Sequence, residues 1–380
     1  MVFATDEIGK NGDIALEEKK LIGAALFAVM SIAHAQNSIT LYGRTDAGFL
    51  FQNQNGGPGA GGKTKSNVFV FNGAGGENTD IYGLVGKEDL GGGIQVGFQL
   101  QGQFNIGTGA LLSSGTIFSQ FSNVYVKSPY GTIKAGQQID PAYVAMGRVD
   151  PRDLKQAYSA AGWWNFLQGK SAAPSQTVYE SNAISYSYSV KNMSGGVLYR
   201  FGNLPGALPQ GRTISSGLVY DDGTLIGSGS FLIKNDSTGA RDLRIWSVGG
   251  GVRLGDFYFR GLYTDYSLPR GNSVAVIGTS PASHVIVGGG GVNWQYSPAQ
   301  MLTVAYYFSE NRQNTADATG SYVISDDYSL SKATTIYGFA GLMTSKKGAT
   351  GLTNLTTAAL TSGYPGANTT SIGVGIIHRF

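Results

Sequence analysis

From Ile39 onward, apolar and polar residues alternate in many short runs. In the clearest run, IQVGFQLQGQFN at 94–105, aliphatic and aromatic residues fall on one face and glutamines on the other. This period of two is that of a β-strand, whose successive side chains point to opposite faces. Similar runs recur at 39–51, 123–127, 196–201, 225–233, 286–296 and 302–309. The pattern predicts an all-β chain with one apolar and one polar face.

Turn signals separate these runs in a regular order. Short turns and long polar stretches alternate, which predicts sixteen strands whose two ends differ. An even number of strands, with short turns on one side and long loops on the other, is typical of a transmembrane antiparallel up-and-down β-barrel. The short turns lie at 88–93, 128–131, 191–196, 221–223, 254–256, 297–300 and 330–333, and the long loops at 52–79, 106–120, 139–181, 203–212, 234–242, 267–284, 310–323 and 345–369.

Other all-β architectures explain the two faces less well. A sandwich or a propeller buries its apolar face against other protein, whereas a soluble barrel would need its outer face covered. Here the second face is rich in Gln, Ser, Thr and Gly, which suits a water-filled lumen. Closing the sheet leaves no unpaired edge in lipid, and about sixteen strands leave an aqueous channel.

The N-terminal residues read as a targeting segment. Lys19 and Lys20 precede the apolar stretch LIGAALFAVMSIAHA, which ends in an A-x-A site at 33–35. A basic start, a short apolar run and small residues at the cleavage site describe a secretory signal peptide. We therefore assign 19–35 to a signal peptide and 36–380 to the barrel, and interpret the acidic stretch 1–18 as an extension ahead of the true start.

Composition adds several exclusions. The chain contains 58 glycines and no cysteine, and charged residues make up 13%. Its net charge of +3 is spread along the chain, without the basic run that would indicate nucleic-acid binding. His284 and His378 are the histidines that remain after signal cleavage, and they show no catalytic or metal-binding spacing. We expect no enzyme activity, no cofactor and no metal site.

Several stretches resemble the Gram-negative general porin family of the β-proteobacterial and neisserial type. NSITLYGRTDAGF at 37–49 resembles the first strand of that family, GLVGKEDLGGGIQVGFQLQ at 83–101 its second hairpin, NVYVKSPYGTIKAGQQ at 123–138 the hairpin before the third loop, and the terminal HRF its last strand. The resemblance implies an outer-membrane homotrimer that lets small hydrophilic solutes diffuse passively. It also implies that the third loop, 139–181, folds into the barrel.

The resemblance and the strand parity together suggest a charged constriction. Opposed charges across a narrow pore focus the field and select ions. The hypothesis is a transverse field between wall arginines and a lysine, all four expected nearer mid-height, and carboxylates on the third loop. The alternative is scattered solvated charges. The wall residues are Arg44, Lys134, Arg200 and Arg260 with Tyr42, and the loop residues are Asp140, Asp150, Arg152 and Asp153.

Ion preference stays open at this stage. Basic residues are common in the family at positions held here by Ile81, Val85 and Gln137. These departures put an anion preference in doubt. The alternatives to a general pore are a solute-selective porin and a barrel that serves mainly as an adhesin or structural anchor.

Two stretches of the third loop predict local structure. Asp150 and Pro151 form an N-cap and N1 pair, which predicts a short helix over 150–161. The aromatic cluster at 163–166 could stack on a solute, but packing of the loop against the barrel wall or a neighbouring subunit is the interpretation we favour.

The terminal stretch GVGIIHRF at 373–380 alternates like a strand. We expect it to pair with the first strand and to close the barrel, with His378 and Phe380 facing lipid. In the resembling family, a terminal phenylalanine is the signal read by the outer-membrane assembly machinery, and this role is assigned here to Phe380.

Overall fold

The computed structural model describes residues 38–55, 66–73, 76–155, 157–159, 161–162, 177–205, 207–268, 284–346 and 366–380. The expected extension at 1–18 and the expected signal peptide at 19–35 lie outside these residues. So does the aromatic cluster at 163–166.

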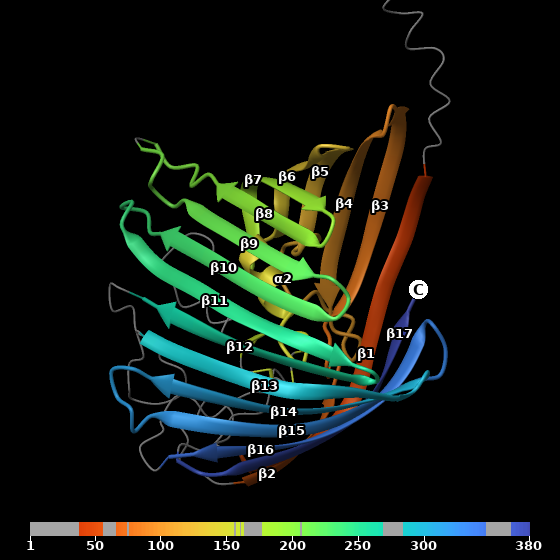
Figure 1. Ribbon diagram of the computed structural model, residues 1–380, viewed down its shortest axis with the longest axis vertical. Coiled ribbons are helices and arrows are strands. Elements are labelled where there is room, and N and C mark those ends of the chain that lie inside the picture. The colour runs from red at the N-terminus through yellow and green to blue at the C-terminus, as the bar shows by residue number, and fades with distance from the viewer. Residues whose placement is uncertain are drawn as a thin grey trace, which may run out of the picture.

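The described residues form one antiparallel sheet that closes on itself (Figure 1). Each strand pairs with its neighbours along the chain, and β17 returns to pair with β1. A short helix, α2 (Pro141–Gly147), follows β6. The strands are β1 Ser38–Asn55, β2 Ser66–Asn72, β3 Asp80–Gly91, β4 Ile94–Phe104, β5 Phe121–Ser128, β6 Gly131–Ile139, β7 Tyr179–Val190, β8 Met193–Arg200, β9 Thr213–Asp221, β10 Leu225–Asn235, β11 Arg241–Leu254, β12 Phe257–Ser267, β13 His284–Ser297, β14 Gln300–Asn311, β15 Ala318–Ser329, β16 Thr334–Ser345 and β17 Thr369–Arg379.

The seventeen elements make sixteen strands, because β2 and β3 are two parts of one strand. Residues 38–44 of β1 pair with β3, and residues 48–55 pair with β2 along the same edge. The predicted closed barrel of sixteen antiparallel strands is confirmed. The prediction of a loop over 52–79 was wrong for 66–72, because the alternating run SNVFVFN pairs with β1 and stacks Phe69 on Phe49, with ring centroids 5.6 Å apart.

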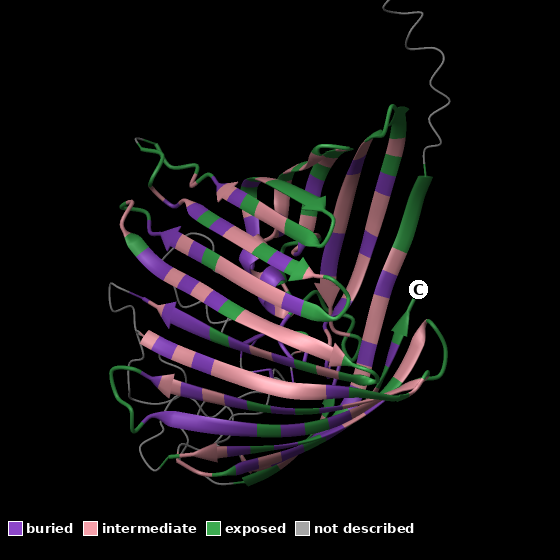
Figure 2. Ribbon diagram, viewed as in Figure 1, coloured by how far each residue is buried: buried purple, intermediate pink, exposed green. Residues whose placement is uncertain are grey.

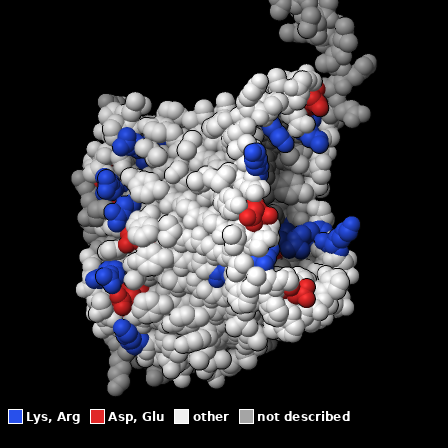
Figure 3. Space-filling view, viewed as in Figure 1, with Lys and Arg blue, Asp and Glu red and all other residues white. Residues whose placement is uncertain are grey.

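The two faces of the barrel differ as the alternation predicts (Figure 2). Outward residues are apolar and uncovered in the isolated chain; Ile39 and Leu41 are 71% and 63% exposed. In Figure 3, a broad uncharged region covers much of the outer face, with many of the charged residues towards its edges. This apolar surface is what a lipid-facing barrel requires. No described helix has the length and apolar composition needed to cross a membrane.

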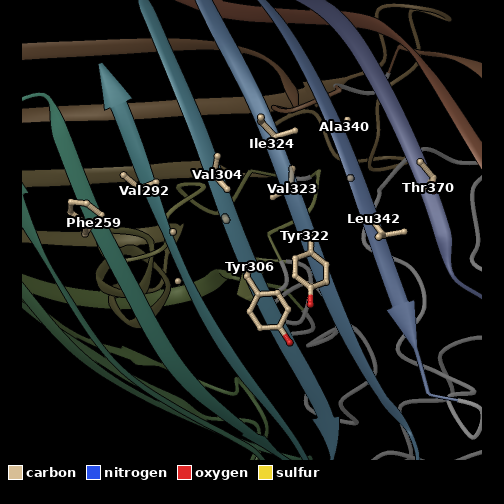
Figure 4. Close-up of a pocket in the computed structure, with 14 residues that line it drawn as sticks. Phe259, Val292, Val304, Tyr306, Tyr322, Val323, Ile324, Ala340, Leu342 and Thr370 are labelled. Atoms are coloured by element: carbon tan, nitrogen blue, oxygen red, sulfur yellow. The ribbon is translucent and has the colours of Figure 1, made fainter. Parts of the chain in front are cut away.

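A shallow apolar depression lies on the outer face across β12 to β17 (Figure 4). The rings of Tyr306 and Tyr322 lie beside each other there, with centroids 4.7 Å apart. Its lining is almost entirely apolar. The depression therefore belongs to the lipid-facing surface, and the candidate site is sought on the inner face.

The barrel closes through the last residue of the chain. The amide of Phe380 donates to the carbonyl of Gly43 at 3.1 Å, and the carbonyl of Phe380 accepts from the amide of Gly43 at 2.9 Å. The phenyl ring covers Gly43, where a methyl group would overlap it. His378 faces outward, and its Nδ1 lies 2.9 Å from the hydroxyl of Thr334. The predicted pairing of the last strand with the first is confirmed.

Candidate functional site on the inner wall and the third loop

The third loop begins with helix α2, which starts at the first of two Asp-Pro pairs. Asp140 Oδ1 accepts a hydrogen bond from the amide of Tyr143 at 2.8 Å, and Pro141 is the first helical residue. Ser215 of β9 donates to the same oxygen at 3.1 Å. Asp140 is fully buried. Its carboxylate is therefore a helix cap fixed to the wall and does not face open solvent.

Helix α2 packs directly on the inner face of β9 and β10. The hydroxyl of Ser228 donates to the carbonyl of Ala145 at 2.7 Å. At Gly217, a methyl group would overlap the carbonyl oxygen of Pro141. The missing side chain at Gly217 thus lets the helix lie against the backbone of the wall.

The second Asp-Pro pair makes a turn, so the prediction of a helix starting there was wrong. Asp150 Oδ2 accepts hydrogen bonds from the amides of Arg152 and Leu154, at 3.2 and 2.7 Å. Asp153 and Leu154 have φ angles of 52° and 55°, which a right-handed helix excludes. Asp150 Oδ1 also accepts from the hydroxyl of Tyr307 at 2.7 Å. These contacts fasten the turn to β14.

Arg152 is buried in a pocket of acceptors. Its guanidinium donates to Glu77 Oε1 at 2.7 Å, to the hydroxyl of Ser325 at 2.6 Å and to the carbonyl of Ala157 at 3.0 Å. Lys155 reaches the other oxygen of Glu77 at 2.5 Å. One carboxylate therefore joins two cations of the third loop.

Glu77 lies in a short segment, 76–79, that interrupts the second strand. Asp46 holds this segment by accepting the amides of Glu77 and Asn78, at 3.0 and 2.6 Å. Arg44 donates to the carbonyl of Thr79 at 2.8 Å, and Tyr337 donates to Asp46 at 2.7 Å. Arg44 thus faces the lumen as predicted, but its described partner is backbone.

Sequence reasoning missed Glu77, although a signal for it exists. A glycine-rich stretch, NGAGGENTD at 72–80, lies between two alternating runs that both pair with β1. Glycines in a strand often mark a bulge or a close backbone approach. An acidic residue at such a break is a candidate partner for cations elsewhere on the inner wall.

The buried charges of the loop are held by their partners. Burial alone would raise the pKa of Glu77, but Lys155 and Arg152 lower it to about 2. Burial opposes charge on Arg152, yet the pairing with Glu77 raises its pKa. Burial raises the pKa of Asp140 to about 6, with nearby Glu180 acting in the same direction. Glu77 is therefore ionised at neutral pH with both cations beside it.

Arg260 joins β12 to the third loop. Its guanidinium contacts the carboxylate of Asp153, donates to the carbonyl of Pro151 at 3.2 Å and to Asn293 Oδ1 at 2.7 Å. It also lies over the ring of Tyr258, 4.6 Å from the centroid. Of the predicted wall and loop residues, Arg260 and Asp153 form a direct ion pair.

Arg200 lies nearer the long-loop end than expected, because β8 ends at this residue. Its Nε is 3.7 Å from Glu180, and another guanidinium nitrogen donates to the carbonyl of Gly211 in the next loop. Glu180 also pairs with Lys234 at 2.6 Å. Arg200 is therefore part of a buried cluster where the third loop rejoins the wall.

The other two wall residues face the lumen in different surroundings. Tyr42 donates to Gln101 at 2.8 Å and accepts from Gln99 at 3.1 Å, which makes a polar row across β1 and β4. Lys134 stands beside Ser185 in the register of β6 and β7. Its ammonium group has no ion pair or hydrogen bond among the described residues.

The family comparison covers most of the chain. A sequence model described as Gram-negative porin matches residues 23–348. The chain is 27% identical to outer membrane porin protein 32 of Delftia acidovorans, with 96% of this chain and all of the relative covered. It is 25% identical to an outer membrane porin protein of Bordetella pertussis, with the same coverage.

Solved structures agree on the fold. An anion-selective porin from Comamonas acidovorans superposes with a TM-score of 0.75 at 21% identity, over 91% of this chain and all of that one. OmpT of Vibrio cholerae superposes with a TM-score of 0.61 at 12% identity, over 90% and 98%. At these identities the structural likeness shows a shared barrel fold, and the sequence match over 23–348 shows the family. The chain belongs to the Gram-negative porin family and is a β-barrel of the outer membrane.

Proposed function

We propose that the chain forms a water-filled pore for passive diffusion of small hydrophilic solutes and ions, narrowed by an inward-folded third loop. The observation that supports a narrowed pore is that two neighbouring residues of the third loop contact well-separated strands. Arg152 reaches β15 and the break in the second strand, while Asp153 reaches β12. A segment held on the inner face of these strands occupies part of the lumen, which is how we propose that it narrows the pore.

The charges left without partners favour anions. The loop carboxylates Asp140, Asp150 and Asp153 are engaged by amides, hydroxyls or Arg260. Among the described residues, the inward-facing Lys134 and Arg379 form no ion pair. Unpaired cations in a low-dielectric pore raise the local concentration of anions. The name of the Comamonas relative, an anion-selective porin, supports the same preference.

The assembly state and the export route are further proposals. We infer a homotrimer in contact with outer-membrane lipids, because the family resemblance implies it and the outer face is apolar. We also infer cleavage after Ala35 and recognition of Phe380 by the outer-membrane assembly machinery. The geometry suggests no reaction, since the described loop carboxylates are engaged by amides, hydroxyls or cations. A pore without enzyme activity is the function that it supports best.

Solute uptake and ion preference are measured separately. Proteoliposomes containing the purified protein should swell in neutral sugars, more slowly as the sugar becomes larger. In planar bilayers with a potassium chloride gradient, the zero-current potential should have the sign of chloride preference. A folded protein that gives neither swelling nor conductance would instead favour an adhesin or an anchor.

A further inference from the structure

A recess opens between helix α2 and the inner wall formed by β6 to β9. Its volume is about 340 Å³, at the small end of the range for small-molecule sites. We propose that it binds small hydroxylated monocarboxylates, such as sugar acids, on their way through the pore. The proposal rests on the proposed pore function and names a solute class for it.

The charge of the recess selects for a single negative group. Lys134 is the one charged residue among those that line it, and no carboxylate is among them. The ammonium group has no described partner to neutralise it. A carboxylate would supply the charge-assisted hydrogen bond that the lysine lacks. One cation matches one carboxylate better than a dianion, whose second charge would stay uncompensated.

The remaining polar lining consists mainly of serine hydroxyls. Ser187 and Ser189 project inward from β7, and Ser194 of β8 lies opposite Ser189 in the strand register. Their side chains have no described hydrogen-bond partner, whereas Ser185 is engaged by Gln138 at 2.5 Å. Each hydroxyl can donate one hydrogen bond and accept two. The first two serines follow one another along β7 away from Ser185, the register partner of the lysine, and therefore suit a solute whose hydroxyls extend along a chain away from its carboxylate.

The shape of the recess is fixed by α2 and by glycine. Pro141 and Val144 of α2 form an apolar side, and Val144 is 49% exposed. Opposite them, a methyl group at Gly196 would reach van der Waals contact with Pro141, at 3.4 Å, and close part of the gap. The glycine therefore leaves the space open. The helix is held in place by its cap at Asp140 and by its close packing on Gly217. The recess therefore exists before the solute enters.

Block of ion current by gluconate tests the proposal. In planar bilayers with potassium chloride, gluconate should reduce the wild-type current in a saturable way. Lys134→Gln should weaken this block by about tenfold or more, the effect of losing one charge-assisted hydrogen bond. Lys127→Gln is the matched control, because Lys127 also faces inward but lies outside the recess at the turn end of β5. It should leave the block within about twofold of wild type.

Solute variation tests the role of the hydroxyls. Butyrate has the charge without the hydroxyls, and glucose has the hydroxyls without the charge; both should block at least about threefold more weakly than gluconate. The double variant Ser189→Ala and Ser194→Ala should weaken the block by gluconate but leave the block by butyrate unchanged. Block that survives Lys134→Gln, or equal block by gluconate and butyrate, would overturn the proposal. A wild-type protein without chloride conductance would instead count against the pore itself.

Discussion

Replacing Glu77 by glutamine should loosen the turn of the third loop. Glu77 and Arg152 have fully buried side chains, and removing one partner of a buried ion pair costs about 3–5 kcal/mol. Lys155 would keep its ion pair with Asp327, at 2.7 Å, and Arg152 would keep its hydrogen bond to the hydroxyl of Ser325. We therefore expect the lower end, about 3 kcal/mol. This corresponds to local opening roughly a hundred times more frequent.

Hydrogen exchange measures this opening directly. The amides of Asp153, Leu154 and Lys155 are all hydrogen-bonded within the turn. Their exchange in detergent-solubilised protein should accelerate roughly a hundredfold in Glu77→Gln. Glu310→Gln is the control, because Glu310 pairs with a half-exposed arginine at the surface and its loss should cost at most about 1 kcal/mol. Exchange that stays within about threefold of wild type in Glu77→Gln would refute the buried-pair reasoning.

The same pair sets the response of the loop to acid. The pKa of Glu77 is lowered from an ordinary value of 4.5 to about 2. A lowered carboxyl pKa stabilises the folded state above the ordinary value, and the contribution is lost as pH falls through about 2. Glu77 should therefore contribute no change in open-channel current noise between pH 7 and pH 5, and any change over this range should be the same in the wild type and in Glu77→Gln. A rise in noise over this range that is absent from Glu77→Gln would contradict the assignment.

Three further changes have defined outcomes. Asp140→Ala should lower stability by about 1 kcal/mol through loss of the helix cap. Burial raises the pKa of Asp140 to about 6, so the stability gained from its protonation is present below about pH 4 and is lost as pH rises through about 6. Asp140→Asn places a neutral amide there and should not lower stability in thermal unfolding at pH 7. Gly217→Val should displace α2, because its side chain would overlap Pro141, and should change single-channel conductance without reducing strand content in circular dichroism. Deletion of Phe380 should lower the yield of folded protein, because it removes two hydrogen bonds to Gly43, and should leave the conductance of the assembled pores unchanged; normal yield would reject this role.

The barrel could be predicted because its pattern is local and repeated. Each strand carries its own alternation, and the short turns separate the strands. The broken second strand could not be read in the same way, because its glycine-rich interruption resembles an ordinary loop. Pairing of β2 with β1 became visible only with the register in place.

The site was predicted in part, for a related reason. Strand parity alone identified Arg44, Lys134 and Arg260 as inward-facing. Their partners depend on the path of the third loop, which no period in the sequence specifies. The helix was predicted at the Asp-Pro pair of 150–151, but the pair at 140–141 is an equal start by local rules. Contacts with β9 and β14 separate the cap at Asp140 from the turn at Asp150.

Single-channel conductance of the purified, folded protein tests the central claim most directly. A water-filled pore narrowed by the third loop predicts discrete current steps whose size rises in proportion to salt conductivity. Gly217→Val, which displaces α2 from the wall, should change the step size. Folded protein that inserts into the bilayer without current steps, or steps that are identical after displacement of α2, would contradict the account.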